Sequence, residues 1–90
     1  MSATVRFRIH AHARSGLLCR IVGLFAQLDL PAPAMRVTIS GTTMDVEANL
    51  AHFGDALVPV VARKIAGFVG VETVVLEAAQ LETGRPMATL

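Results

Sequence analysis

The sequence predicts an α+β sandwich in which two helices cover one face of a four-stranded antiparallel sheet. Four segments alternate apolar and polar residues with a period of two, which is typical of half-buried strands. Two other segments repeat apolar residues at spacings of three and four, which is typical of amphipathic helices. The order strand, helix, strand, strand, helix, strand lets both helices lie on the same face. A chain of 90 residues, 53% of them hydrophobic, is expected to form one such domain.

The first strand and the first helix fill the N-terminal third of the chain. The strand alternates between two sets, of which the inward one is Val5, Phe7, Ile9 and Ala11 and the outward one is Arg6, Arg8, His10 and His12. Apolar residues at helical spacing then predict a helix over residues 16–28, with Ser15 as its N-cap. Pro31 and Pro33 lack a backbone N–H and prevent continuation, so the helix ends by Leu30.

A β-hairpin follows the first helix. Residues 35–40 and residues 44–50 each alternate apolar and polar side chains, and Gly41 and Thr42 form the turn between them. Both strands are therefore amphipathic. Their apolar residues are Met35, Val37 and Ile39 in the second strand and Met44, Val46, Ala48 and Leu50 in the third.

A second helix and a fourth strand complete the predicted domain. The helix is expected over residues 56–67, with Asp55 near its start and Pro59 in its first turn. Alternation over residues 73–78 predicts the last strand. Residues 79–90 show no periodicity, and we expect a flexible C-terminal tail there. The folded domain is thus predicted to span residues 1–78.

The charges of the outward-facing residues predict the strand order. The solvent side of the first strand is basic, whereas the third strand offers Asp45 and Glu47 and the fourth offers Glu77. Opposite charges facing each other across strands contribute roughly 0.2 to 1 kcal/mol per pair. The first strand is therefore placed between the third and the fourth, in the order 4-1-3-2 of the ferredoxin-like βαββαβ sandwich. Its arginines are interpreted as neutralised within the sheet.

The sequence contains no motif of an enzyme or of a metal centre. His10, His12 and His52 have no cysteine, serine or carboxylate at the spacing of a triad or an acid–base pair. Cys19 has no second thiol with which to form a disulfide or hold a metal. We therefore predict no catalytic residue, no metal and no cofactor. An enzyme that uses His10 or His12 as a base is an alternative that depends on those histidines alone.

Neither nucleic acid nor a membrane is expected as a partner. A sheet of this kind binds single-stranded RNA by stacking bases on aromatic side chains of its open face, but Phe7 is in phase with the core residues. The net charge of +1 gives little attraction to phosphates. A nucleic-acid binder that uses Arg6, Arg8 and Arg36 is the remaining alternative. No apolar stretch approaches the roughly 20 residues of a membrane span, and one cysteine fits a reducing cytoplasm.

The turn between the first strand and the first helix is the strongest candidate for a binding site. Gly16 lies at the helix start, where the missing side chain lets a ligand or a neighbouring chain approach the backbone. The N–H groups of the first helical turn have no partner within the helix and suit a carboxylate. The alternative interpretation is that Gly16 only permits a tight connection from strand to helix.

Three segments resemble the ACT domain, a regulatory module that senses amino acids: RSGLL at residues 14–18, IVGLFA at 21–26 and KIAGFVGVETV at 64–74. The resemblance covers residues 4–78 and is strongest to the small regulatory subunit of acetolactate synthase. It implies a non-catalytic homodimer that binds valine or a related amino acid where the first turn of one protomer meets the next. It also implies a partner, the thiamine-diphosphate-dependent large subunit of branched-chain amino acid biosynthesis.

The resemblance assigns ligand contacts to Ala13, Arg14, Ser15, Gly16, Leu17 and Pro31. At Ala13 and Pro31 the family has a polar side chain that holds the ligand, an amide or carboxylate at the first position and an amide at the second. An ammonium group is costly to bury without an acceptor. Two hypotheses follow. The domain senses a different small acid, held by Arg14 and the N–H groups of the turn, or it is a degenerate ACT domain that acts only in assembly.

Dimerisation has a physical motive of its own, because a small domain leaves apolar surface and two edge strands unpaired. The second strand is one edge and carries a single charge, so it can pair with its own copy across a two-fold axis. Glycine inside a helix costs about 1 kcal/mol relative to alanine, which indicates a close approach at Gly23 or simple internal packing. The predicted interface residues are Gly23, Met35, Arg36, Val37, Thr38 and Ile39.

Overall fold

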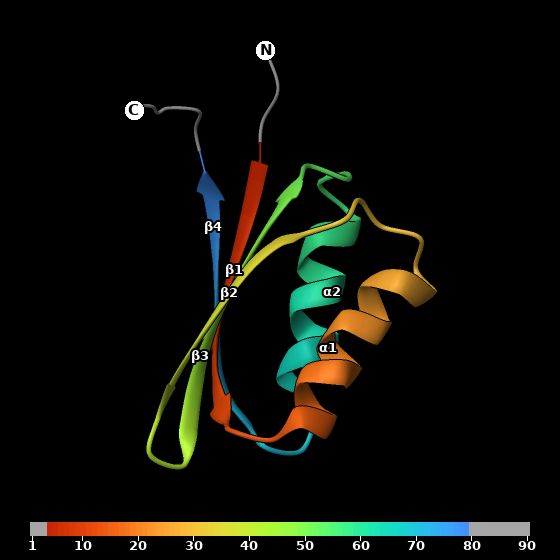
Figure 1. Ribbon diagram of the computed structural model, residues 1–90. Coiled ribbons are helices and arrows are strands. Elements are labelled where there is room, and N and C mark those ends of the chain that lie inside the picture. The colour runs from red at the N-terminus through yellow and green to blue at the C-terminus, as the bar shows by residue number, and fades with distance from the viewer. Residues whose placement is uncertain (1–3, 80–90) are drawn as a thin grey trace.

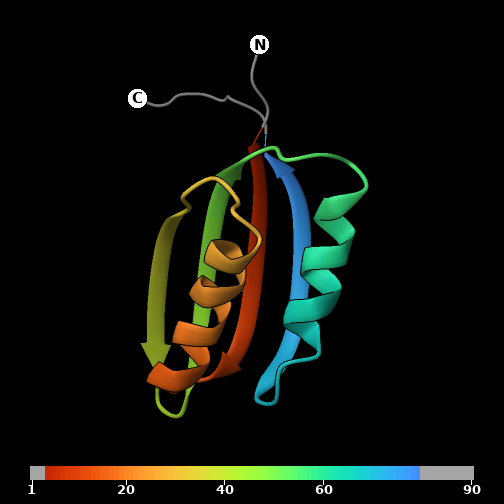
Figure 2. The same cartoon turned by 90° about the vertical axis from the view of Figure 1, so that its right-hand side faces the viewer.

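The computed structural model describes residues 4–79, which form two layers (Figure 1). One layer is a four-stranded sheet, and the other consists of two antiparallel helices that cover a single face of it (Figure 2). The elements are β1 (Thr4–His12), α1 (Ser15–Gln27), β2 (Ala34–Ser40), β3 (Thr43–Ala51), α2 (Leu57–Ala66) and β4 (Val71–Ala79). All strand pairs are antiparallel and the order is β2-β3-β1-β4, which confirms the predicted ferredoxin-like arrangement.

The core lies between the sheet and the helices and is wholly apolar among the described residues. The inward positions of β1 and β3 are buried as their alternation predicts. Phe7 is fully buried in β1, with its ring centroid 5.9 Å from that of Phe25 and 6.3 Å from that of Phe53. From the helices, Ile21 and Ile65 are fully buried against the sheet. Each such side chain contributes roughly 1.5 to 3 kcal/mol on leaving water.

Helix α1 starts one residue earlier than its apolar pattern indicates, and Ser15 is not its N-cap. Arg14 occupies that position, with extended backbone angles and no side-chain hydrogen bond to the helix. The carbonyl of Arg14 accepts the first helical hydrogen bond, from the N–H of Leu18 at 3.1 Å. Ser15 therefore lies inside the first turn, where its backbone is already helical and cannot adopt the extended conformation of a cap.

The helix stops at Asp29, before the prolines are reached. Asp29 has a positive φ of 54°, its N–H donates to the carbonyl of Ala26, and the N–H of Leu30 donates to the carbonyl of Phe25. This pair of hydrogen bonds is the Schellman motif, which satisfies carbonyls left open at a helix end. The prediction that the helix is over by Leu30 is confirmed. The helix ends at the left-handed Asp29, before it reaches the prolines that were predicted to stop it.

The remaining elements follow the predicted ones within two residues. Gly41 and Thr42 form the hairpin turn, with Gly41 at a φ of 61°. Helix α2 carries Pro59 in its first turn, as predicted. Strand β4 begins at Val71 and includes Ala79, the first residue of the predicted tail. Residues 80–90 of that tail lie outside the described residues.

Candidate functional site

Three loops meet at the end of the sheet where β1 passes into α1. The N–H of Ala13 donates to the carbonyl of Thr42 in the hairpin turn at 2.9 Å. The N–H of His12 donates to the carbonyl of Gly70, just before β4, also at 2.9 Å. The turn that carries the predicted ligand contacts is thus held on both sides by backbone hydrogen bonds.

Within this turn, Gly16 is not required by anything inside the protomer. Its φ is outside the left-handed region, and a Cβ added to it would meet no heavy atom within 4 Å. A tight connection from strand to helix is therefore not the reason for a glycine at this position. Arg14, Ser15 and Gly16 are exposed, whereas Leu17 is buried beneath them. The exposed turn carries a guanidinium and the N–H groups of a helix start, which together suit a carboxylate.

The structure does not bring Pro31 to this turn. Pro31 lies in the loop between α1 and β2, at the other end of the helix (Figure 2). A helix of 13 residues is about 20 Å long, so the two positions belong to opposite ends of the molecule. Within one protomer the contacts that the resemblance implies are split between the turn and Pro31. They can form one site only where two copies meet.

Strand β2 is an edge of the sheet, as predicted. Met35 and Val37 are half-buried on the helix-covered side, and Ile39 is 65% exposed. No strand pairs with the outer edge of β2 among residues 4–79. The predicted dimer residues of β2 therefore form a continuous surface strand with one large apolar side chain in solvent. Such an edge is open to pairing with another chain.

Gly23 also lies on the surface, on α1. A Cβ at this position would have no heavy atom within 4 Å. Internal packing, one of the two interpretations of Gly23, is therefore wrong for the part of the chain that the structure describes. Its place in a dimer interface stays a prediction.

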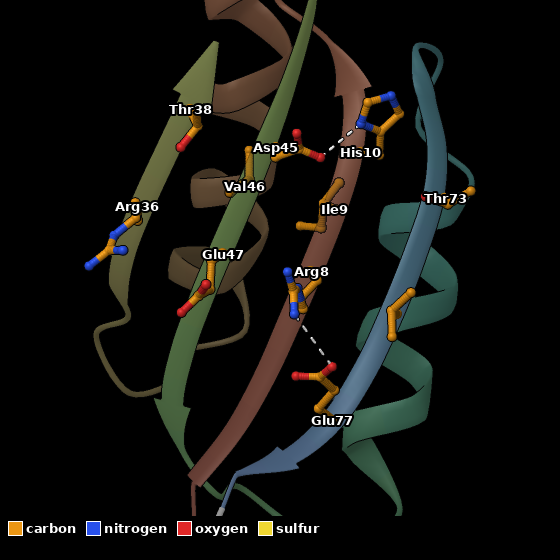
Figure 3. Close-up of a pocket in the computed structure, with 11 residues that line it drawn as sticks. Arg8, Ile9, His10, Arg36, Thr38, Asp45, Val46, Glu47, Thr73 and Glu77 are labelled. Atoms are coloured by element: carbon orange, nitrogen blue, oxygen red, sulfur yellow. Dashed lines mark hydrogen bonds and ion pairs between the residues drawn. The ribbon is translucent and has the colours of Figure 1, made fainter. Parts of the chain in front are cut away.

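The uncovered face of the sheet carries a network of ion pairs (Figure 3). The Arg6 guanidinium lies between Glu47 and Glu77, at 3.6 Å from a carboxylate oxygen of each, and its Nε–H donates to the Asn49 side-chain carbonyl at 2.8 Å. Arg8 lies 3.7 Å from a second oxygen of Glu77. The interpretation that the first-strand arginines are neutralised within the sheet is confirmed.

His10 and His12 belong to the same network. The Nδ1–H of His10 donates to Asp45 at 2.8 Å, and its Nε2 lies 3.4 Å from Glu72. The hydrogen bond to Asp45 raises the pKa of His10 above its ordinary value; desolvation opposes this rise, and the charges of Asp45 and Glu72 add to it. The Nε2 of His12 lies 3.5 Å from the other oxygen of Glu72. Residues 4–79 contain no cluster of three side chains arranged to hold a metal ion.

Glu72 lies on the uncovered face of the sheet near His10 and His12, and the alternation of the sequence did not predict this position. Strict alternation would place it on the same side of β4 as Val74, toward the helices. The register between β1 and β4 shifts between His10 and Ala11, and this β-bulge leaves Glu72 as an extra residue. Its carboxylate then reaches both histidines. No periodicity signal in the sequence marks the bulge.

Comparison with known proteins identifies the family. The sequence model of the ACT-like domain matches residues 1–83. The chain belongs to the ACT-like domain family. ACT domains are in general regulatory, ligand-binding and non-catalytic modules. A search of curated proteins found no matching sequence.

Solved structures show the same fold at low sequence identity. The ACT domain of GTP pyrophosphokinase from Chlorobium tepidum superposes with a TM-score of 0.74 at 14% identity. The match covers 86% of this chain and 100% of the pyrophosphokinase ACT domain. The C-terminal domain of the MgtC protein from Mycobacterium tuberculosis gives 0.74 at 15% identity, with coverages of 93% and 95%. A homoserine dehydrogenase from Thiobacillus denitrificans gives 0.70 at 20% identity, over 87% of this chain and 17% of the enzyme. At these identities the similarity concerns the fold.

Among residues 4–79, neither helix has the length and the apolar character of a membrane-spanning helix.

Proposed function

We propose that this ACT-like domain is a cytoplasmic regulatory subunit that works as a homodimer. It binds an amino acid or a small carboxylic acid at the turn between β1 and α1, where that turn meets a second copy, and so modulates a partner enzyme. The partner is a thiamine-diphosphate-dependent large subunit of the acetolactate synthase type, a choice that depends on the sequence resemblance alone. Strand β2 pairs with its own copy to form the dimer.

The observation that carries this proposal is the environment of Gly16. Neither backbone conformation nor a close neighbour within the protomer requires glycine there, although glycine is among the weakest helix formers. A requirement from outside the protomer, by a ligand or by the second copy, accounts for it. Arg14, two residues before Gly16 in the same turn, supplies a positive charge for the carboxylate.

Thermal unfolding with a panel of amino acids and small carboxylic acids tests the binding. A ligand present at a hundred times its Kd stabilises the folded state by about 2.7 kcal/mol, which raises the Tm of a domain this small by roughly 10 °C or more. We expect such a shift with valine, leucine or isoleucine. Gly16→Ala should keep or slightly raise the ligand-free Tm and lose much of the shift. Cys19→Ala, on an exposed position of the same helix, should keep the shift.

A degenerate domain that acts only in assembly is the second candidate. It is favoured by the side chains at Ala13 and Pro31, neither of which can accept a hydrogen bond from an ammonium group. This candidate predicts a dimer in light scattering and no Tm shift with any member of the panel. A monomer at high micromolar concentration would contradict both candidates. Unchanged activity of a purified acetolactate synthase large subunit after addition of the domain would contradict the choice of partner.

A further inference from the structure

A second surface of the domain, on the face opposite to the ion-pair network, collects positive charge. A groove of about 650 Å³ is lined by residues of α1 and by residues at the C-terminal end of α2. In Figure 2 these two helices lie side by side in the helical layer. Arg20 lines it from α1, and Arg63 and Lys64 line it from the last turn of α2. No acidic residue lines the groove, and these three cations form no ion pair within residues 4–79. The positive charge of the groove is therefore not compensated by an acidic side chain in its lining.

The walls of the groove leave room for a ligand. Gly23 and Gly67 lie in its lining, and a Cβ at Gly23 would have no heavy atom within 4 Å. Phe68 and Leu24 supply apolar surface, and the guanidinium carbon of Arg20 lies 6.0 Å from the centre of the Phe68 ring. The volume falls within the range of about 300 to 1,000 Å³ that is typical of small-molecule sites.

Helix electrostatics explain only part of this charge. Arg63 and Lys64 lie in the last turn of α2, where cations interact favourably with the helix dipole. This does not account for Arg20, which faces them across the groove from the middle of α1. Like charges that face one another repel, and an anion between them would remove the repulsion. Two guanidinium groups and one ammonium group suit an anion with more than one negative charge.

We infer that the groove between α1 and α2 binds a small molecule that carries two or more phosphoryl groups. A small ligand fits better than a polymer, because the positive charge is confined to one part of the helical layer. Of the described cations, only Arg20, Arg63 and Lys64 line the groove. The inference goes beyond the proposed function, since none of the groove residues belongs to the turn between β1 and α1.

Isothermal titration calorimetry of the whole chain with pyrophosphate as the probe, at low salt, tests the inference. We expect one site per chain. Arg20→Gln and Arg63→Gln should each weaken the binding by about tenfold or more, because each removes a charge-assisted hydrogen bond. Arg8→Gln is the matched control: it removes the same charge from the opposite face, where the side chain is 57% exposed. Its affinity for pyrophosphate should equal that of the wild type.

Several outcomes would overturn the inference. Absence of heat with pyrophosphate would do so, and so would an equal loss of affinity in Arg8→Gln, which would indicate unspecific attraction. Binding to acidic phospholipid vesicles or to single-stranded RNA without binding to pyrophosphate would identify a macromolecular partner instead. Unfolding curves of Arg20→Gln and Arg63→Gln check that both variants are folded. Amino-acid binding at the turn is measured by Tm shifts of wild type and Gly16→Ala, and phosphate binding in the groove is measured by calorimetry. Failure of one proposal therefore leaves the other testable.

Discussion

Gly70 lies directly against Leu17, so that the segment before β4 closes over the start of α1. A Cβ at Gly70 would lie 3.1 Å from Cδ2 of Leu17, and the backbone of Gly70 has a φ of 100°. Leu17 is buried and belongs to the core. The carbonyl of Gly70 also accepts the N–H of His12. This contact fixes the candidate ligand turn relative to the sheet.

Gly70→Ala is therefore expected to destabilise the domain by roughly 1 to 3 kcal/mol, since a side chain is strained at this φ and also crowds Leu17. Urea unfolding followed by far-UV circular dichroism measures the change. Gly16→Ala is the matched control, because its position has an ordinary φ and no neighbour within 4 Å. It should leave the domain as stable as the wild type or slightly more stable. Equal stability of Gly70→Ala and the wild type would contradict the observed packing of this loop.

The pKa of His10 predicts a pH-dependent part of the stability. This pKa is raised in the folded state, above the ordinary 6.5. The protonated form is the one stabilised by Asp45 and Glu72. The contribution of His10 is therefore fully present below pH 6.5 and is lost as the pH rises through the folded-state pKa.

His10→Gln tests this pH dependence. The difference in unfolding free energy between wild type and His10→Gln, measured by urea unfolding from pH 5.5 to 8.5, should shrink as the pH rises. Asp45→Asn removes the main cause of the raised pKa and should give a similar trend. His12, which shares Glu72 with His10, is present in both proteins. A difference that is constant over this pH range would contradict the prediction.

The left-handed conformation of Asp29 predicts a stabilising substitution. An L-residue in this region costs roughly 1 kcal/mol relative to glycine, and the Schellman motif at the end of α1 holds Asp29 there. Asp29→Gly is expected to stabilise the domain by about 0.5 to 1 kcal/mol, whereas Asp29→Ala should not. Thermal unfolding of both variants at one protein concentration measures the effect. A lower Tm for Asp29→Gly than for the wild type would count against this helix end.

The periodicity of the sequence was sufficient to predict every element, because the core is apolar and the open face is polar. The strand order was predicted from the opposite charges on the open face. Alternation identifies β1 and β3 most sharply, since their inward residues are buried and their outward residues meet opposite charges. It is weaker in β4, where Leu76 lies opposite Phe7 on the core side and is still 40% exposed at the edge of the sheet. Periodicity therefore predicts best in the central strands β1 and β3, which have a partner strand on each side.

Features that depend on local backbone geometry were not predictable from the pattern. The cap of α1 is at Arg14 because Arg14 is the last extended residue and the backbone is already helical at Ser15, and neither side chain reveals this. Glu72 reaches the histidines only through a β-bulge. The basic groove combines Arg20 with residues more than forty positions away, which only the packing of the two helices brings together.

The exposed edge of the sheet gives the last prediction. Ile39 is 65% exposed on β2, which has no partner strand on its outer side among residues 4–79. Ile39→Lys adds a charge of the kind that protects natural edge strands from pairing. Because Ile39 is exposed in the protomer, we expect the monomer fold to be kept and its stability to change by less than about 0.5 kcal/mol.

In the homodimer that we propose, the same substitution would place a lysine from each copy in the strand pair that β2 forms with its own copy. Dimerisation measured by light scattering should therefore weaken by about tenfold or more, since a charged side chain on an edge strand opposes pairing with another strand. Thr73→Lys is the matched control, because it adds the same charge to an exposed position of β4. If Ile39→Lys and wild type dimerise equally while Thr73→Lys does not, the interface lies at β4 and not at β2.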